Sequence, residues 1–452
     1  MKRFILEQSE TEFYTSHSGL ALVGLCLNRY GQLNQALKKG IPLRHGISHA
    51  DVIKSYMGTL CLGKSDFEAI ENHRDDDYFK TALAIQQVPS SARLRQRLDE
   101  HAKALLPIIY QSHIDFLVHA QVPVTPLTTG HVALDIDVYP MNNEKARKEG
   151  VSRTYKGFDG YAPMALYLGK EGWCIGNELR EGKQHCQYEF RYSLERGLAA
   201  AKRLTTLPLL VRLDSGHDAL DNRIDLHEAD QVDFIIKWNP RKQDADVWLA
   251  YAEQHGQWTS PREGKRVALF SVTDEQTRHG KTYPCRRVMQ ITERTMTPQG
   301  QLLLVPDIEI EGWWTSLQPA NYDDTLIIAL YRDHATAEQF HSEFKTDLDI
   351  ERLPSGKPVQ SEVEGFATND LIMTLSAYSY NILRWIGLIG LLGEQNPVRH
   401  PAKRRRIKTV IQELMYLAAR FVRSSHRQKL RFSQCCPGFI AFESTYAKLA
   451  VG

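Results

Sequence analysis

The spacing of hydrophobic residues divides the chain into regions with different secondary structure. In residues 1–125, apolar side chains repeat every three or four positions, as in HADVIKSYMGTLCLG at 49–63, which is the period of an amphipathic helix. A serine precedes the next such pattern, SSARLRQRLDEHAKALLPIIYQSHIDFLVHA, and serine commonly caps a helix. The pattern therefore predicts a helical N-terminal region.

A strand pattern begins after the prolines at 123 and 126. In HVALDIDVYP, apolar side chains alternate with positions that include Asp135 and Asp137, which is the period of a strand. The strand-like segments GYAPMALYLG and GWCIGNEL follow, and the helical pattern SLERGLAAAKRL leads into a further strand, LPLLVRLDSGHD. Residues 126–230 thus predict a unit of strands and helices.

The predicted secondary structure changes again in the three regions that follow. Residues 231–325 predict a β-rich insertion made of the runs VDFIIKW, DVWLAYAE, KRVALFSV, RRVMQITERT and QLLLVPDIEIEGWW. Residues 326–397 predict a helix around Tyr331 and a long buried helix in NDLIMTLSAYSYNILRWIGLIGLL. Residues 398–452 predict a basic, helical C-terminal region.

The helix after the insertion has an unusual row of polar side chains. Tyr331, His334, Glu338 and Lys345 are spaced i, i+3, i+7 and i+14, which places them within about 60° of one another on one helix face. Apolar residues occupy the adjoining side. An amphipathic helix with a few charges beside its buried face is the commoner explanation, so a functional interpretation needs partners elsewhere in the chain.

Composition and charge narrow the class of protein. The chain has 452 residues, of which 42% are hydrophobic, and no apolar run approaches the ~20 residues of a membrane span. The first residues have too short an apolar core for a signal peptide. Seven cysteines form no CxxC pair, and His185–Cys186 and the scattered histidines lack the spacing of a zinc site. We therefore expect a cytoplasmic protein without a membrane partner.

The net charge of +2 hides a strongly basic segment. From Val398 to Arg431 there are eleven Lys or Arg residues against one acid, Glu413. Segments this one-sided often contact phosphate, although a solvated helix face is the alternative. The segment predicts DNA contacts by the four consecutive basic residues Lys403, Arg404, Arg405 and Arg406.

Carboxylates occur on several of the predicted elements. Asp135 and Asp137 share the polar face of one strand, Asp214 ends another strand, and Glu338 projects from the later helix. Buried carboxylates need a cation or a donor, and converging carboxylates suit Mg²⁺. An aspartate at a strand end is often only a turn former, and spacing alone does not establish convergence.

Three ordered blocks resemble a known family. Tyr331-x2-His334-x3-Glu338-x6-Lys345 resembles the Y-x2-R-x3-E-x6-K signature of bacterial insertion-sequence DDE transposases, the cut-and-paste group. LDIDVYPMNNEKARKEGVSRTYKGFDGYAPM and LLVRLDSGHDAL are similar to the blocks around the first and second catalytic Asp of that family. The resemblance extends over residues 50 to 435, approximately.

The resemblance implies a fold class and a catalytic triad. The fold is α/β, an RNase H-like mixed sheet flanked by helices, formed by 126–230 and 326–397, with the β-rich insertion and a helical, DNA-binding N-terminal region. The triad is Asp137, Asp214 and Glu338, which bind two Mg²⁺ ions, with Mn²⁺ as a substitute. Asp135 is the alternative first ligand, because Val138-Tyr139 stands where the family usually has x-Thr.

The resemblance also implies DNA contacts. Tyr331 and Lys345 would hold backbone phosphates, and His334 replaces the Arg of the signature. Family members that excise through a DNA hairpin stack a flipped base on a tryptophan of the insertion, for which Trp313 and Trp314 are candidates. Asp218 is a candidate for supporting the metal ligands.

The function that follows is a transposase. It would bind the terminal inverted repeats of its own element, cleave DNA and join the 3′-OH end to target DNA, as a dimer when two ends are paired. A metal-dependent nuclease and an inactive DNA-binding relic are the alternatives. GTLCLGKS at 58–65 matches a phosphate-binding loop by its letters, but the helical pattern before it argues against ATP binding.

Overall fold

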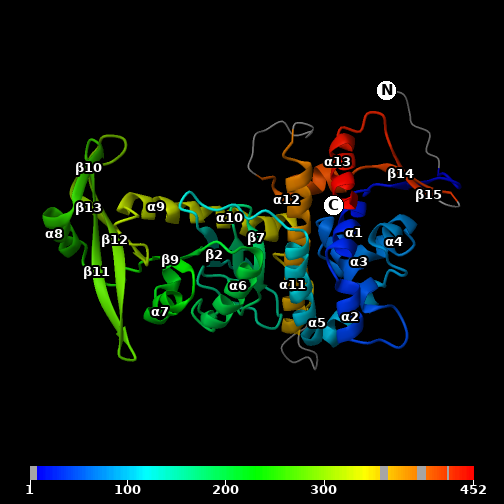
Figure 1. The fold of residues 1–452 in the computed structure, drawn as a ribbon, viewed down its shortest axis with the longest axis horizontal. Coiled ribbons are helices and arrows are strands. Elements are labelled where there is room, and N and C mark those ends of the chain that lie inside the picture. Colours follow the sequence, from blue (N-terminus) through cyan, green and yellow to red (C-terminus); the bar gives the residue numbers. More distant parts are fainter. Residues whose placement is uncertain (1–7, 357–364, 394–403, 425–426, 452) are drawn as a thin grey trace.

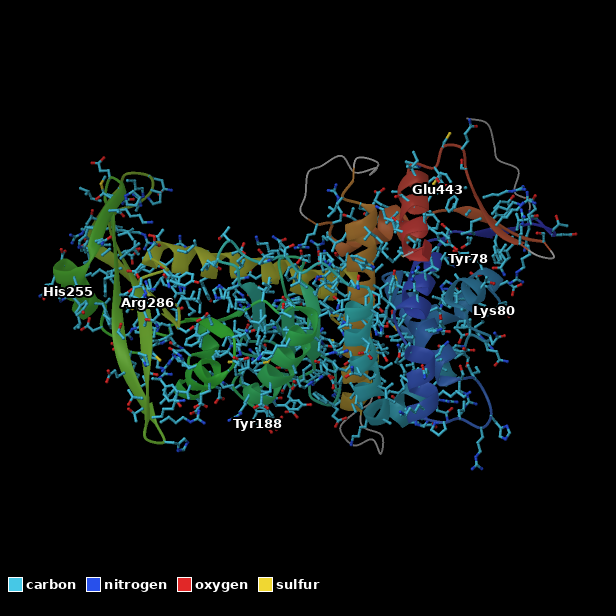
Figure 2. All side chains as sticks on the ribbon, in the orientation of Figure 1. Tyr78, Lys80, Tyr188, His255, Arg286 and Glu443 are labelled. Atoms are coloured by element: carbon cyan, nitrogen blue, oxygen red, sulfur yellow. The ribbon has the colours of Figure 1, made fainter. Side chains whose placement is uncertain are left out.

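The computed structural model describes residues 8–356, 365–393, 404–424 and 427–451. The molecule is elongated, with the β-rich insertion at one end and the two chain termini near the other (Figure 1). His255 marks the insertion end, and Glu443 marks the terminal end (Figure 2). Among the described residues, no helix is both long and apolar enough to cross a membrane.

The N-terminal region is helical, as predicted. Serines cap two of its helices: the Ser48 Oγ accepts a hydrogen bond from the Asp51 N–H, and the Ser90 Oγ accepts one from the Arg93 N–H. Gly58 to Cys61 of the GTLCLGKS segment lie inside a helix rather than in a loop after a strand. The helices are α1 (Leu20–Arg29), α2 (Leu33–Gly40), α3 (His49–Cys61), α4 (Asp77–Leu83) and α5 (Ser91–His119), with a 3₁₀ helix at Phe67–His73.

A nine-stranded mixed sheet is the centre of the structure, in the order β10-β11-β12-β13-β9-β8-β2-β6-β7. Its core strands are β2 (Val132–Val138), β6 (Met164–Leu168), β7 (Trp173–Glu178), β8 (Leu209–Leu213) and β9 (Val232–Lys237). β2, β8 and β9 are parallel neighbours, whereas β6 and β7 are antiparallel to the strands beside them. Helices α6 (Phe190–Leu204) and α7 (Leu220–Glu228) pack on β7 and β9. A small separate sheet contains β3 (Met141–Asn142), β4 (Ser152–Arg153) and β5 (Asp159–Tyr161).

The β-rich insertion extends this sheet instead of forming a separate one. β13 pairs antiparallel with β9, which itself pairs with β8, so β9 belongs to the core although the sequence pattern placed it in the insertion. The inserted strands are β10 (Gln257–Arg262), β11 (Lys265–Arg278), β12 (Lys281–Met296) and β13 (Leu302–Thr315). The predicted fold class, a mixed sheet flanked by helices with a β-rich insertion and a helical N-terminal region, is confirmed.

One predicted strand of the insertion is a helix. DVWLAYAE lies in α8 (Ala245–His255), and the side chain of Asp244 caps this helix by accepting a hydrogen bond from the Asp246 N–H. The Trp248 and Tyr251 rings both contact the Phe270 ring of β11, with centroids 6.3 and 5.3 Å away. The segment contains so many apolar residues that its hydrophobic period does not distinguish a strand from a helix. The Asp244 cap and the contact of one apolar face with β11 favour the helix.

A helical stretch crosses from the insertion back over the core sheet. It consists of α9 (Asp324–Arg332), a 3₁₀ turn (Asp333–Ala335), α10 (Thr336–Ser342) and a π-helical turn (Glu343–Asp347). α11 (Gly365–Gly390) then packs against α5 and β7 and is mostly buried, as its apolar sequence predicted.

The C-terminal region is not wholly helical, contrary to the prediction. After α12 (Ile407–Val410) and a π-helical turn (Ile411–Met415), β14 (Ala419–Ser424) and β15 (Arg427–Phe432) form a hairpin, followed by α13 (Phe439–Val451). β14 also pairs with β1 (Phe13–Thr15). This pairing with a strand some 400 residues away in sequence is tertiary, so no local pattern could indicate it.

Candidate active site

The parallel pairing of β2 with β8 places the two aspartates of β2 beside the end of β8. Asp135 is in register with Arg212, and Ile136 with Leu213. Continuing this register by one residue puts Asp137 level with Asp214. Because parallel strands end at the same edge of a sheet, the two carboxylates meet there.

Asp135 is neutralised by a buried ion pair. The Arg212 Nε and Nη2 donate to its two carboxylate oxygens at 2.6 and 2.7 Å, and the His334 Nδ1 lies 2.9 Å from Oδ1. Burial alone would raise the pKa of Asp135, but the Arg212 guanidinium and His334 lower it to about 2. Both oxygens of Asp135 are therefore engaged within the protein.

Among the described residues, no lysine or arginine pairs with Asp137 or Asp214, whose ionisable partners are His341 and His217. Burial, and then the negative charge of Asp214, raise the pKa of Asp137 to about 6. Asp214 accepts hydrogen bonds from the Gly216 N–H at 3.2 Å and from the His217 Nδ1 at 2.7 Å. Burial tends to raise the pKa of Asp214, but the hydrogen bond and charge of His217, the charge of His334 and the Gly216 hydrogen bond together lower it below the ordinary value. Two carboxylates that repel each other at a partly exposed sheet edge would be stabilised by a bound cation.

The polar face of the crossing helix lies along β2. His334 contacts Asp135, the His341 Nδ1 is 3.8 Å from the Asp137 Oδ2, and the Lys345 Nζ donates to the Pro140 carbonyl at 3.3 Å. Glu338 is one turn beyond His334 on this face and is exposed. His334, His341 and Lys345 therefore lie along β2, and the placement of Glu338 at the carboxylate pair stays a prediction.

Tyr331 extends the same face toward the aspartates. Its ring centroid is 5.7 Å from that of His334. Burial first, and then the carboxylates of Asp214, Asp137 and Asp135, raise the pKa of its hydroxyl above the ordinary value. The phenol is therefore held in its neutral, hydrogen-bonding form beside the carboxylate pair.

The three carboxylates of the predicted triad do not form one tight cluster. In the described part of the chain, Asp137, Asp214 and Glu338 are not a group whose ligand atoms all lie within 4.8 Å of one another. A two-metal site does not require this, because the ions are about 4 Å apart and each outer carboxylate holds one ion at about 2 Å. The oxygens of the second Asp and the Glu can then be about 8 Å apart.

The candidate tryptophans lie inside the protein. Trp314 is 5% exposed, and two guanidinium groups contact its ring, with the Arg223 and Arg287 Cζ atoms 4.4 and 4.6 Å from the ring centroid. Trp313 is 1% exposed, with the Lys237 Nζ 4.3 Å from its ring centroid. Stacking of a base on Trp314 stays a prediction, and in this structure arginines occupy the ring faces.

The basic residues of the C-terminal region contact the crossing helix. Arg404 donates to Glu343 and Gln339 at 2.8 Å each, and Arg406 donates to both oxygens of Asp347. Arg405 is 9% exposed and donates to the Leu391 carbonyl. Lys403 lies outside the described residues. Arg404 and Arg406 also line a cavity of about 640 Å³ that reaches Asp135, Arg212 and Lys170. Both arginines therefore hold the C-terminal region against the crossing helix, and their contact with DNA stays a prediction.

Sequence reasoning missed the residues that hold the aspartates in place. Arg212 and His217 contact Asp135 and Asp214, and the Tyr155 hydroxyl, whose pKa rises to about 12 through burial and the charges of Asp137 and Asp214, lies beside the carboxylate pair. The one available signal was Arg212, because an arginine inside the apolar run LPLLVRL requires a buried partner.

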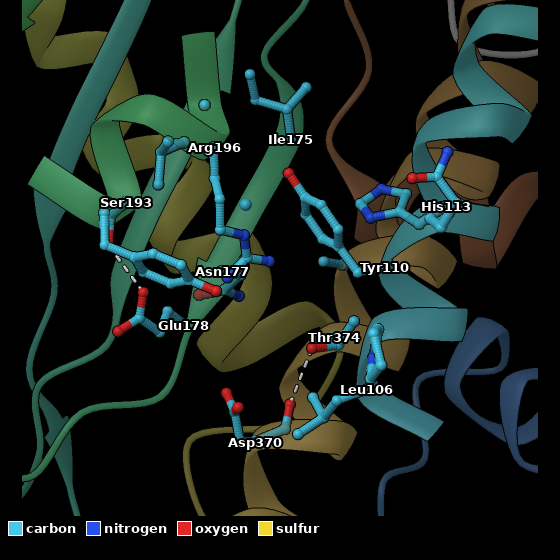
Figure 3. A pocket seen from close by; sticks show the side chains of 17 residues that line it. Leu106, Tyr110, His113, Ile175, Asn177, Glu178, Ser193, Arg196, Asp370 and Thr374 are labelled. Atoms are coloured by element: carbon cyan, nitrogen blue, oxygen red, sulfur yellow. Dashed lines mark hydrogen bonds between the residues drawn. The ribbon is translucent and has the colours of Figure 1, made fainter. Parts of the chain in front are cut away.

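A separate cavity of about 400 Å³ lies between α5, α6, β7 and α11. Its lining includes Tyr110, Asn177, Glu178, Arg196 and Asp370, whose side chains surround the hollow in Figure 3. The lining contains no member of the predicted triad, so this cavity is not the candidate active site.

The family follows from comparison with known sequences. A family model described as "Transposase DDE domain group 1" matches residues 6–451. The chain belongs to this transposase family. Transposases of this family cleave and transfer DNA and generally use divalent metal ions. The resemblance of the three sequence blocks to DDE transposases is thereby confirmed, and the bacterial insertion-sequence group with its signature stays a prediction.

Further similarity to known proteins is weak. A solved structure described as the cryo-EM synaptic complex of piggyBac transposase with hairpin DNA is similar to this transposase with a TM-score of 0.37 and 10% identity. The similarity covers 97% of this chain and 82% of that chain, but at this score it adds nothing to the family assignment. No curated protein sequence is significantly similar to the chain.

Proposed function

We propose that this transposase binds the terminal inverted repeats of its own insertion sequence, cleaves the DNA there and joins the 3′-OH end to target DNA. The carboxylate pair of Asp137 and Asp214, with His334 and His341 of the crossing helix against the same strand, is the observation that supports the proposal. The core strands would form an RNase H-like fold in which these three residues are the catalytic triad.

The residues fit a pair of divalent cations. Asp137 is held at a raised pKa beside Asp214, and this unrelieved repulsion is what a bound cation would remove. Asp137, Asp214 and Glu338 would hold two Mg²⁺ ions, with Mn²⁺ as a substitute, because hard cations prefer carboxylate oxygens. When bound, such ions activate a water or a 3′-OH and stabilise the leaving oxygen.

The residues around the triad would position DNA. Lys345 lies beside the end of β2 and Tyr331 beside the aspartates, so both would contact backbone phosphates near the cleaved end. His334 occupies the signature Arg position and contacts Asp135. It would therefore orient the Asp135–Arg212 pair as well as approach phosphate. Lys403 to Arg406 would contact the backbone farther along, and Trp314 would take up a flipped base.

The test uses DNA that carries the terminal repeats flanking the protein's own gene. Incubation with Mg²⁺ should release 3′-OH ends at the repeat boundary and then join them to a supercoiled target. Two chains should be present in the complex that pairs two ends, which can be measured by light scattering. Asp214→Asn serves as the inactive control.

The two alternatives give different products in the same assay. A nuclease would cleave without forming joined products, and an inactive relic would bind the ends without nicking them in either Mg²⁺ or Mn²⁺. Either result contradicts the proposed reaction.

A further inference from the structure

We propose that His17, His73 and Asp76 form a structural zinc site, distinct from the catalytic carboxylates, that fastens the start of the chain to the N-terminal helices. His17 follows β1, His73 ends the 3₁₀ helix Phe67–His73, and Asp76 directly precedes α4. The three residues thus come from two segments, one with His17 and one turn with His73 and Asp76, in which the Asp76 N–H donates to the His73 carbonyl. Within the described ranges, they are the one group of three His, Cys, Asp or Glu residues whose ligand atoms all lie within 4.8 Å of one another.

The distances between the ligand atoms suit zinc. The Asp76 Oδ2 is 3.0 Å from the His17 Nε2 and 3.9 Å from the His73 Nδ1. With bonds of about 2.0–2.1 Å, tetrahedral zinc separates its ligand atoms by about 3.4 Å. The two observed distances lie on either side of this value, so small side-chain rotations complete the geometry.

His73 supplies the strongest independent sign of a missing ligand. Its side chain is 6% exposed, and neither ring nitrogen has a hydrogen-bond partner among the described residues. A buried imidazole with both nitrogens unsatisfied is costly. Its ring is held by stacking on Phe79, with centroids 4.4 Å apart and planes at 15°. This stacking orients His73 beside the Asp76 oxygen without using its nitrogens.

The other two ligands are also oriented by neighbours. The His17 Nδ1 lies 3.4 Å from the Ser16 Oγ, and its Nε2 is directed at Asp76. The Asp76 Oδ1 accepts the Phe79 N–H that begins α4, which leaves Oδ2 for the histidines. Such outer contacts are typical of the ligands in a metal centre.

The chemistry of the ligand set selects the class of ion. Two imidazoles and one carboxylate suit Zn²⁺, whereas Mg²⁺ and Ca²⁺ prefer oxygen ligands throughout. A water molecule would complete the tetrahedron. The site would join β1 to α4 near the C-terminal hairpin, because β1 pairs with β14 and the Tyr78 hydroxyl of α4 donates to the Ser18 carbonyl. Figure 1 shows α4 beside the sheet that contains β14 and β15.

The experiment measures metal content and melting temperature of the full-length protein. Asp137→Asn/Asp214→Asn is used as the background, so that zinc at the catalytic carboxylates does not contribute. About one equivalent of zinc per chain should co-purify, and a strong chelator should lower the melting temperature by about 5 °C. Adding Zn²⁺ back should restore it, whereas Mg²⁺ should not.

His73→Phe is the diagnostic variant, because it keeps the buried ring on Phe79 and removes the nitrogens. It should lose the zinc and its response to the chelator. His49→Phe is the matched control: His49 is another buried histidine of the N-terminal region that contacts a second imidazole, that of His101, at a centroid distance of 4.8 Å. That variant should keep the zinc.

Two results would overturn the site. The first is an Asp137→Asn/Asp214→Asn protein, with His17, His73 and Asp76 unchanged, that retains no zinc and melts at the same temperature with chelator, with Zn²⁺ and without either. The second is zinc retained at one equivalent in His73→Phe. If His73→Phe fails to fold, His17→Gln replaces it and should also lose the zinc. The effect of the chelator on the melting temperature of the protein with all three ligands then tests the site as well.

Discussion

Arg212 forms a bidentate ion pair with Asp135 across two neighbouring parallel strands, with donor–acceptor distances of 2.6 and 2.7 Å. The pair separates the roles of the two aspartates of β2. Asp135 has its charge balanced inside the protein, whereas Asp137, two residues later on the same strand face, has Asp214 as its charged neighbour. This difference assigns a fold role to the first aspartate and leaves the second available for a cation.

Asparagine substitutions at the two positions should therefore have opposite consequences. Asp137→Asn should abolish cleavage without loss of stability. Asp135→Asn should leave measurable cleavage in the folded protein but lower the free energy of unfolding by about 3–5 kcal/mol, because Arg212 loses the partner of its buried charge. Urea unfolding and a cleavage assay on the same preparations check both. Full activity of Asp137→Asn together with loss of activity in Asp135→Asn would move the ligand to Asp135.

The pH dependence of stability should have a specific sign at Asp137. Its pKa is about 6 when folded against 3.8 for the ordinary group, so the folded state binds this proton more tightly. The charge therefore costs stability above about pH 6, and the cost disappears below about pH 4. Without divalent ions, Asp137→Asn should be more stable than wild type by up to about 3 kcal/mol near neutral pH.

That advantage should shrink toward zero as the pH falls to about 4. Asp135 provides the internal comparison, because its pKa is lowered to about 2. Its contribution is present above the ordinary pKa and is lost as the pH falls through the folded value. Unfolding curves of wild type and both variants from about pH 2 to about pH 8 measure these trends, with the Asp137 change above about pH 4 and the Asp135 change below it. A stability difference for Asp137→Asn that does not change with pH would contradict the charge repulsion.

Glu338→Gln should separate catalysis from binding. The side chain is exposed, so the substitution should not change the melting temperature, and gel-shift affinity for the end DNA should persist. Loss of a metal ligand should lower the cleavage rate about 100-fold or more. Glu275→Gln, an exposed position on β11, is the matched control. Cleavage at the wild-type rate in Mg²⁺ would remove Glu338 from the triad.

The basic residues of the C-terminal region can be tested for DNA contact by salt dependence. Replacing Lys403, Arg404, Arg405 and Arg406 by Gln should weaken binding to end DNA and unrelated DNA alike. It should also flatten the slope of log affinity against log salt by up to about 0.9 for each phosphate that the variant no longer neutralises. An unchanged slope would mean that these residues do not touch DNA.

Two single substitutions separate DNA contact from a fold role. The Arg406 side chain is 47% exposed although it pairs with Asp347, so Arg406→Gln should change the slope. Arg405 is buried, so Arg405→Gln should lower the melting temperature and leave the slope unchanged. Melting curves recorded beside the binding isotherms give both quantities.

The sequence determined most of the local structure and the family. The two-residue period of HVALDIDVYP, the serine caps of α3 and α5, and the spacing of His334 and Lys345 on one helix face all follow from interactions within a few residues. These local patterns can be recognised in the sequence without knowledge of the tertiary structure. The transposase family was indicated separately, by the resemblance of the blocks around Asp137, Asp214 and Glu338 to the motifs of that family.

Only the tertiary structure decided which groups face each other. Strand parity put Asp135 and Asp137 on the same face, and the register with Arg212 and Asp214 then distinguished them. In DVWLAYAE, the contact of Trp248 and Tyr251 with Phe270 of β11 acts together with the local Asp244 cap. β14 pairs with β1 through contacts between distant segments. The His17, His73 and Asp76 side chains show this most clearly, because 55 intervening residues separate His17 from His73 in the sequence. Sequence spacing cannot reveal a site whose ligands are brought together only by folding.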